Sequence, residues 1–191
     1  MKLNVRWGYN NVQIKEENEW KAAFQCNHGL FKPIVMIFGL TNSLATFQTM
    51  INEIFADLIM ENKVCIYIDD ILIYSADLEK HHQITDMVLQ RLRKHKLYLK
   101  LDKCEFEKQC IKYLRLIISE GKIEMDLVKV AGVADWLTLK SKKEVQQFMG
   151  FTNFHQWFIK DYSYVARPLF NLTGNVKFKW EEEQEQAFTE L

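Results

Sequence analysis

The chain has 191 residues, and its 25 Lys and Arg residues balance its 25 Asp and Glu residues, so its formal net charge is zero. Hydrophobic residues make up 48% and charged residues 26%, which is typical of a globular chain and excludes an intrinsically disordered one. The sequence has no run of about 18 uncharged apolar residues and no charged-then-apolar leader. We therefore expect an intracellular protein, cytoplasmic or nuclear, that is not secreted and has no membrane as a partner.

The composition is poor in residues that usually form turns, with two prolines and seven glycines. The four cysteines lack the spacing of a zinc site or of a disulfide framework, and we expect thiols in a reducing compartment. They are Cys26, Cys65, Cys104 and Cys110.

The first part of the chain predicts strands and one helix. Short apolar runs alternate with polar residues over residues 3–24, which predicts two or three short strands. Over residues 42–60, apolar side chains recur every three or four positions, which predicts an amphipathic helix. Two β-rich runs within residues 64–74 flank Asp69 and Asp70, which predicts a tight hairpin with these two residues as its turn.

The rest of the chain predicts one more hairpin, over residues 111–124 with Glu120-Gly121 as its turn, and then helices. Helices are expected at residues 77–96, 141–158, 161–172 and 180–191. Ser141 and Glu144 have the spacing of a capping box. Five aromatic residues at helical spacing predict a buried face: Phe148, Phe151, Phe154, Trp157 and Phe158. Strands followed by helices predict an α+β fold with a small helical domain at the end.

Asp69 and Asp70 are the most informative pair of residues in the sequence. Two adjacent carboxylates in an otherwise apolar run are costly unless a turn exposes them or a cation pairs with them. A solvated hairpin turn is one explanation, because Asp is a common turn residue. A divalent-metal site for phosphoryl chemistry is the other, because Mg²⁺ is often held by one or two carboxylates together with substrate phosphates. The dipeptide alone leaves both explanations open.

Two other groups of residues are weaker candidates. His82 and Asp86 lie four positions apart on a predicted helix, but two possible ligands without a third are more typical of a solvated helix face than of a metal site. A lysine-rich group is either an exposed helix start or a patch that contacts phosphates. It consists of Lys140, Lys142, Lys143 and Lys160, with Trp157 beside them.

The segment Tyr67-Ile68-Asp69-Asp70 resembles the YxDD box of reverse transcriptases, and its context is similar to the gypsy-like class of long-terminal-repeat retrotransposons. Other segments that resemble this family lie at residues 3–14, 38–43, 45–48, 103–106, 113–121, 136, 148–150, 158–159 and 166–169. The resemblance implies a reverse-transcriptase palm, which is an antiparallel sheet packed on helices, with a remnant of the fingers and a small helical thumb after it.

The resemblance also implies three parts of the chain. Residues 1–124 would be the palm with partial fingers, residues 125–172 the thumb, and residues 173–191 the truncated start of a connection or ribonuclease H region. The N-terminal fingers segment, ribonuclease H and integrase of the parent polyprotein would be missing. The implied activity is RNA-directed DNA polymerisation. Two Mg²⁺ ions would assist nucleotide transfer from a dNTP to the 3′-hydroxyl of a primer on an RNA or DNA template.

The resemblance assigns roles to individual residues. Asp69 and Asp70 would hold the metal, and Asn4 stands where the family has its first catalytic Asp. The nucleotide site would contain Tyr9, Phe38, Gly39 and Gln48, with Tyr9 as the steric gate. The primer grip would contain Leu114 and Arg115.

Two departures from the family pattern bear on activity. Asn4 is uncharged where the family has Asp, and Arg115 replaces a glycine of the primer grip. Losing one well-placed electrostatic group often costs ~10²–10³-fold in rate, so we expect impaired catalysis. The alternatives are a non-catalytic remnant that binds primer–template, and an eroded retroelement relic. Erosion would explain the proline shortage, because the family typically has proline at five leucine positions: Leu44, Leu101, Leu127, Leu137 and Leu139.

Overall fold

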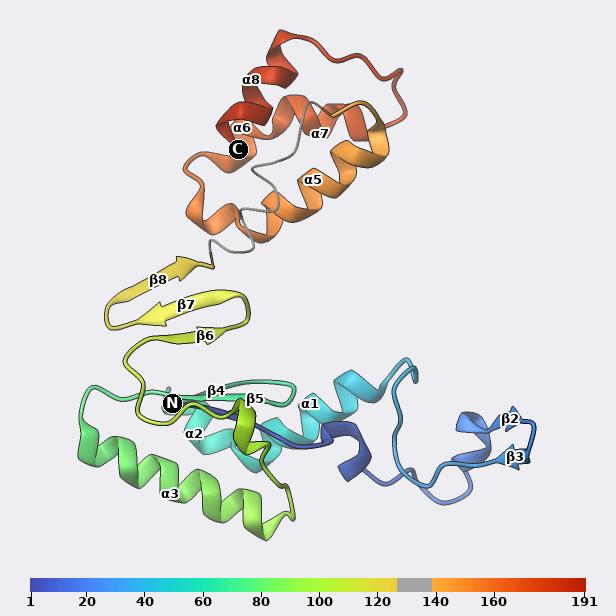
Figure 1. Ribbon diagram of the computed structural model, residues 1–191, viewed down its shortest axis with the longest axis vertical. Helices are drawn as coiled ribbons and strands as arrows, with labels where there is room; N and C mark the ends of the chain where they lie inside the picture. The colour runs from blue at the N-terminus through green and yellow to red at the C-terminus, as the bar shows by residue number, and fades with distance from the viewer. Residues whose placement is uncertain (127–138) are drawn as a thin grey trace. The chain divides into compact units, whose positions relative to one another are not determined.

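The computed structural model describes residues 1–126 and 139–191 (Figure 1). These residues form two compact units, Met1–Tyr113 and Leu114–Leu191, each with its own hydrophobic core. Antiparallel sheets and separate helices make the fold α+β, as the sequence predicts. Over the ranges described, no helix combines the length and the apolar character needed to cross a bilayer.

The first unit is built on a three-stranded antiparallel sheet with the strand order β1-β5-β4. Its strands are β1 (Lys2–Asn4), β4 (Val64–Tyr67) and β5 (Asp70–Ile73). On the other side of β1, Val5 bridges to Leu99 and Lys2 bridges to Glu105. β1 therefore has a partner on both sides, and Leu3 at its centre is fully buried.

Three helices pack against this sheet (Figure 1). They are α1 (Ser43–Ile54), α2 (Ala56–Met60) and α3 (Leu78–Lys94). The single helix predicted over residues 42–60 is interrupted at Phe55, which separates α1 from α2. α3 is confirmed, and the carboxylate of Asp77 caps it by accepting from the backbone N–H groups of Glu79 and Lys80.

The strands predicted over residues 3–24 are largely wrong. After β1 the chain forms two 3₁₀ helices, Gly8–Asn11 and Glu19–Ala22, and then β2 (Phe24–Cys26) pairs with β3 (Gly29–Phe31). The alternating apolar side chains do not share one buried face, because Trp7 and Trp20 are 68% and 62% exposed. The β2–β3 hairpin was not predicted, since each of its strands has only three residues.

The predicted hairpin of β4 and β5 is confirmed, but its turn is wrong by one residue. Tyr67 pairs with Asp70, so the loop consists of Ile68 and Asp69, and Asp70 is the first residue of β5. The sequence favoured Asp-Asp as the turn because Asp suits turns. A contact from α1 to the backbone of Ile68 outweighs that preference.

β6 (Ile111–Tyr113) ends the first unit, and a hairpin of β7 (Leu116–Ser119) and β8 (Lys122–Met125) begins the second. β7 and β8 pair antiparallel around Glu120-Gly121, as predicted. The strand predicted over residues 111–119 is broken at Leu114 and Arg115, whose φ angles are 49° and 67°. Residues 127–138, the first part of the predicted helical region, lie outside the described residues.

Helices complete the second unit: α5 (Lys142–Phe154), α6 (Tyr162–Val165), α7 (Arg167–Thr173) and α8 (Glu182–Glu190). Ser141 caps α5 by accepting from the Glu144 N–H at 3.3 Å, as the capping box predicts. The Glu144 carboxylate, however, accepts from the N–H of Lys140 and not from that of Ser141.

The buried aromatic face predicted for α5 is only partly right. Phe148 is buried, whereas Phe154, Phe158 and Trp157 are 49%, 38% and 91% exposed. α5 ends at Phe154, and a 3₁₀ turn over Gln156–Phe158 changes the helical period. The aromatic residues beyond the helix end therefore leave the buried face.

Candidate functional site

The β4–β5 turn is held in place from two sides. Ile68 has a φ of 54°, an unusual conformation for a β-branched residue. The Gln48 side chain from α1 stabilises it, since its Oε1 accepts from the Ile68 N–H at 2.7 Å and its Nε2 donates to the carbonyl of Ile66 at 3.3 Å. The Asp69 carbonyl accepts from the Val5 N–H at 2.7 Å. Both contacts fix the place where Asp69 and Asp70 leave the turn.

Asn4 lies directly opposite Asp70 in the sheet, because β1 and β5 pair in that register. Its Nδ2 donates to Oδ1 of Asp70 at 2.9 Å, and the residue is 9% exposed. The Asn4 carbonyl accepts from the Lys100 N–H at 2.8 Å, and its N–H donates to Sγ of Cys104 at 3.4 Å. The residue predicted to replace a catalytic carboxylate is therefore buried, with its backbone held in the sheet and its amide hydrogen-bonded to Asp70.

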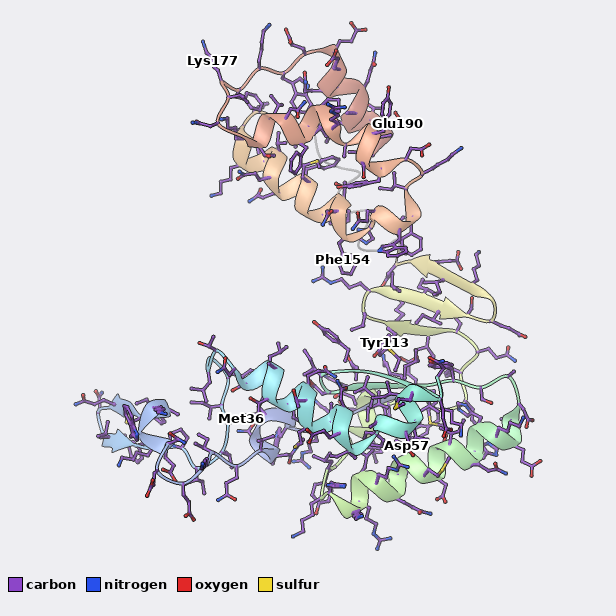
Figure 2. The ribbon with its side chains drawn as sticks, turned by 180° about the vertical axis from the view of Figure 1, so that it is seen from behind. Met36, Asp57, Tyr113, Phe154, Lys177 and Glu190 are labelled. Carbon is purple, nitrogen blue, oxygen red and sulfur yellow. The ribbon has the colours of Figure 1, made fainter. Side chains whose placement is uncertain are left out.

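β5 is also supported by Tyr113, which is labelled in Figure 2. Its hydroxyl lies 3.3 Å from the carbonyl of Cys65 and 3.4 Å from that of Asp70, within donating distance of both. Tyr113 is 4% exposed, and burial raises the pKa of its phenol above the ordinary value. It remains a neutral donor beneath the hairpin.

The Asp69 carboxylate is partly buried, and its own backbone N–H donates a hydrogen bond to it. Burial raises the pKa of Asp69 above its usual range, and the nearby charge of Asp70 raises it further. The positive charge of Lys103 lowers the pKa of Asp69 and so opposes these two effects. In residues 1–126 and 139–191, no Lys or Arg forms an ion pair with this carboxylate. The Asp69 carboxylate is therefore available to a ligand, whereas Oδ1 of Asp70 already accepts a hydrogen bond from Asn4.

A cavity of about 680 Å³ lies beside Asp69 and brings several predicted residues together. Asn4, Tyr9, Phe38 and Asp69 all line it. The rings of Tyr9 and Phe38 meet edge to face with their centroids 5.0 Å apart. Burial, followed by the charge of Asp69, raises the pKa of the Tyr9 hydroxyl, which therefore stays protonated.

Three basic residues that the sequence analysis did not assign to this site also line the cavity: Arg6, Lys100 and Lys103. Arg6 could have been assigned to the site from the sequence, because it lies two residues after Asn4. Lys100 and Lys103 had no such signal, because the pairing of Val5 with Leu99 brings their segment to the site.

The other predicted site residues are placed differently. Gly39 follows Phe38 with a φ of 96° and is exposed, and Gln48 contacts the turn. Neither residue lines the cavity. Leu114 and Arg115 belong to the second unit, where the Arg115 guanidinium lies 5.6 Å from the ring centroid of Phe154.

Asp69 and Asp70 are the residues at this turn with the donor chemistry to hold a hard cation such as Mg²⁺, although only Asp69 lines the cavity. Asp69 offers a carboxylate without an ion-pair partner among the described residues, and Asp70 offers its second oxygen. Mg²⁺ prefers oxygen ligands and is often bound by one or two carboxylates plus substrate phosphates. The Asn4 amide supplies no charge, so the set has one carboxylate fewer than the resemblance implies for two ions.

The weaker metal candidate does not form a common site. His82 contacts Glu107 at 2.7 Å, and the Asp86 carboxylate accepts from Gln90 at 2.6 Å. Outside residues 127–138, no group of three or more His, Cys, Asp and Glu side chains is placed to hold a metal ion. All four cysteines are free thiols, and Cys65 is exposed.

A second cavity, of about 750 Å³, lies within the second unit. Its lining includes Gln156, Trp157, Tyr162 and Tyr164. Trp157 is 91% and Tyr164 81% exposed, so two large aromatic rings face solvent at its border. Phe154, at the end of α5 and labelled in Figure 2, adds a third exposed ring to this unit.

Comparison with known proteins identifies the family. Residues 1–118 match the family described as reverse transcriptase (RNA-dependent DNA polymerase). The Transposon Tf2-3 and Tf2-7 polyproteins of Schizosaccharomyces pombe are 34% and 33% identical to this chain over all 191 residues, which span 14% of each polyprotein.

Two solved structures share the fold. The foamy viral protease-reverse transcriptase in complex with an RNA/DNA hybrid matches 99% of this chain and 26% of its own, with a TM-score of 0.83 and 19% identity. A second foamy viral structure, in complex with double-stranded DNA, matches 99% of this chain and 33% of its own, with a TM-score of 0.87 and 19% identity. The predicted resemblance to retrotransposon enzymes is confirmed, and the chain belongs to the reverse transcriptase family.

Proposed function

We propose that the chain supplies the palm and thumb of a retrotransposon RNA-directed DNA polymerase, with a nucleotidyl-transfer site at Asn4, Asp69 and Asp70. Residues 1–124 would be the palm with partial fingers, residues 125–172 the thumb, and residues 173–191 the start of the connection or ribonuclease H region. The observation that carries the proposal is the register of β1 and β5, which places Asn4 opposite Asp70. The cavity beside Asp69 provides room for a nucleotide.

The residues around this cavity suit a dNTP. The edge-to-face rings of Tyr9 and Phe38 would form an apolar wall against the sugar. Arg6, Lys100 and Lys103 would offset the negative charge of the triphosphate. Gln48 would keep the turn, and with it Asp69, in position.

Asp69 and the second oxygen of Asp70 would hold Mg²⁺. When bound, this ion stabilises the charge on the attacking and leaving oxygens of phosphoryl transfer. Because Asn4 provides no negative charge, we infer that catalysis is impaired by at least ~10²–10³-fold relative to a carboxylate at this position.

Primer extension on poly(rA) with an oligo(dT) primer and Mg²⁺ or Mn²⁺ tests this proposal. We expect no detectable extension by the 191-residue chain. The variant Asn4→Asp, joined to the fingers segment of a Tf2 polyprotein, should extend the primer, whereas Asn62→Asp in the same fusion should not. Extension by the Asn4 form at the rate of Asn4→Asp would contradict the proposed impairment.

A second candidate function is binding of primer–template without catalysis. The exposed rings of Trp157 and Tyr164 favour it, since aromatic side chains can stack on the bases of a single-stranded template overhang. The lysines predicted as a phosphate patch are near this region in the chain, although Lys142 donates to the carbonyl of Gly174 at 2.8 Å.

Fluorescence anisotropy of a labelled primer–template at two salt concentrations tests the binding function. We expect affinity that falls with salt, because phosphate contacts release counterions. Trp157→Ala should weaken binding by roughly 1–3 kcal/mol, and Trp157→Phe, which keeps a ring, should retain most of it. Negligible binding at low salt, together with no extension, would favour an eroded relic.

A further inference from the structure

The hydrogen bond between Asn4 and Asp70 has a direct consequence for metal binding. It joins Nδ2 of Asn4 to Oδ1 of Asp70 at 2.9 Å, in a partly buried part of the sheet. Backbone contacts to Lys100 and Cys104 fix Asn4 from the other side of β1. The backbone of Asn4 is therefore held in the sheet, which keeps the side-chain amide within hydrogen-bond reach of Asp70.

An N–H group that donates to a carboxylate forms a charge-assisted hydrogen bond, which is stronger than a neutral one. In the folded chain this neutral amide gives the Asp70 carboxylate a hydrogen-bond donor at a place where a cation would otherwise contact it. The hydrogen bond also uses one lone pair of Oδ1, which leaves the second oxygen of Asp70 as the freer ligand for a metal. A carboxylate at position 4 would do the opposite, because it would face Asp70 with a like charge and repel it.

The turn itself does not require a metal. Gln48 binds the backbone of Ile68, and Val5 binds the carbonyl of Asp69. With Asn4 holding the Asp70 side chain, every fixed contact of this site comes from the protein. The Asp69 carboxylate forms no ion pair with the described residues.

We propose that Asn4 is a positioning residue that holds Asp70 in place of a cation. It thereby makes the site independent of metal for folding and restricts it to one divalent ion, bound by Asp69 and the second oxygen of Asp70. This inference rests on the proposed function, because that proposal assigns the two carboxylates to metal binding.

Thermal unfolding of the 191-residue chain with EDTA or with Mn²⁺ tests the first half. The wild-type melting temperature should change little between the two conditions. Asn4→Asp should melt lower in EDTA, by about 4–8 °C, and recover with Mn²⁺. The matched control is Asn62→Asp, which adds the same charge at an exposed position between α2 and β4 and should show no metal-dependent shift. Equal melting of Asn4→Asp and wild type in EDTA would overturn the proposal.

Asn4→Leu removes the donor without adding a charge, and it keeps the proposal testable if Asn4→Asp fails to fold. It should melt several degrees below wild type with or without Mn²⁺. An unchanged melting temperature would show that the hydrogen bond does not hold Asp70.

Counting bound Mn²⁺ by electron paramagnetic resonance tests the second half. We expect one ion per wild-type chain and a second ion on Asn4→Asp. No ion or two ions on the wild-type chain would overturn the inferred stoichiometry. None of these measurements uses nucleic acid. If Asn4→Asp restores extension without changing metal dependence, this inference fails while the proposed function stands.

Discussion

Two hairpins of this protein have loops of the same length, but their turns are stabilised differently. The β7–β8 turn has Gly121 at a φ of 64°, and glycine adopts such a conformation without steric cost. It is exposed, as is its neighbour Glu120. The β4–β5 turn has Ile68 at a φ of 54°, where a β-branched side chain is strained.

The strain at Ile68 is offset by contacts that have no counterpart at the β7–β8 turn among the residues that the structure describes. Gln48 accepts from the Ile68 N–H, and Val5 donates to the Asp69 carbonyl. Backbone strain of this kind costs of order 1–3 kcal/mol and tends to persist at functional sites, where the surrounding structure enforces it. The surrounding structure therefore holds the first turn in the conformation that places Asp69, whereas the second turn only reverses the chain.

The largest expected effect is that of Gln48→Ala. This change leaves the Ile68 N–H and the Ile66 carbonyl without their side-chain partner, so the free energy of unfolding should fall by ~1–3 kcal/mol. Urea denaturation followed by circular dichroism measures it. Gln83→Ala, on the exposed surface of α3, is the matched control and should change stability by less than ~0.5 kcal/mol. Equal losses in the two variants would remove the distinction between the hairpins.

The next effect concerns the β7–β8 turn. Gly121→Val places a β-branched residue at a positive φ, with no supporting side-chain contact from residues 1–126 or 139–191, and should cost ~1–2 kcal/mol. The transition of the second unit in the same denaturation experiment reports it. Lys122→Val, at the next position and within β8, is the control and should be close to neutral. A tolerated Gly121→Val would mean that positive φ alone does not distinguish the two turns.

A smaller effect is the pH dependence of stability, to which Asp69 of the first turn should contribute and Glu120 of the second should not. Burial raises the folded-state pKa of Asp69, so the folded chain binds this proton more tightly than the unfolded chain does. The unfolding free energy should therefore fall as pH rises from about 3.9, the ordinary pKa of Asp, through the raised folded value. Asp69→Asn should remove that fall and be more stable than wild type at neutral pH in EDTA.

The control for Asp69→Asn is Glu120→Gln, which removes the same charge from the exposed turn. It should change the unfolding free energy by less than ~0.5 kcal/mol. Denaturation with urea from acidic to neutral pH compares the two variants. A wild-type profile retained in Asp69→Asn would show that this carboxyl is not the source of the slope.

The smallest effect is a gain beside the first turn. Leu101 opens a 3₁₀ helix, is 71% exposed, and follows Lys100 in an extended conformation (φ −96°, ψ 90°). Proline suits this position, so Leu101→Pro should stabilise the chain by ~0.4–1 kcal/mol by restricting the unfolded state. Differential scanning calorimetry measures the shift, and Leu101→Ala controls for loss of the side chain. A lower melting temperature would show that the Leu101 N–H is needed.

Much of the fold could be predicted from local patterns. α3 and the β4–β5 and β7–β8 hairpins follow from apolar periodicity and turn residues, as does the region of α1 and α2. The turn register could not, because the contact between Gln48 and Ile68 is tertiary. The exposure of Trp157 could not either, since periodicity does not reveal that α5 ends at Phe154.

The site also has a part that the sequence predicts and a part that depends on tertiary structure. The motif identifies Asp69 and Asp70 from adjacent residues in the sequence. The hydrogen bond from Asn4 to Asp70 joins residues 66 positions apart and depends on sheet register. Lys100 and Lys103 reach the cavity through the pairing of Val5 with Leu99, which local patterns do not encode.

The central position of β1 has a consequence for how the protein folds. Its neighbours in the sheet are β5 on one side and the chain around Leu99 and Glu105 on the other. Such non-local pairing raises contact order and slows folding, because a long loop must close first. During synthesis β1 is made before its partners, and it cannot complete its pairing until residue 105 has been added. For that interval Leu3 and Val5, both buried in the folded unit, are open to association with other chains.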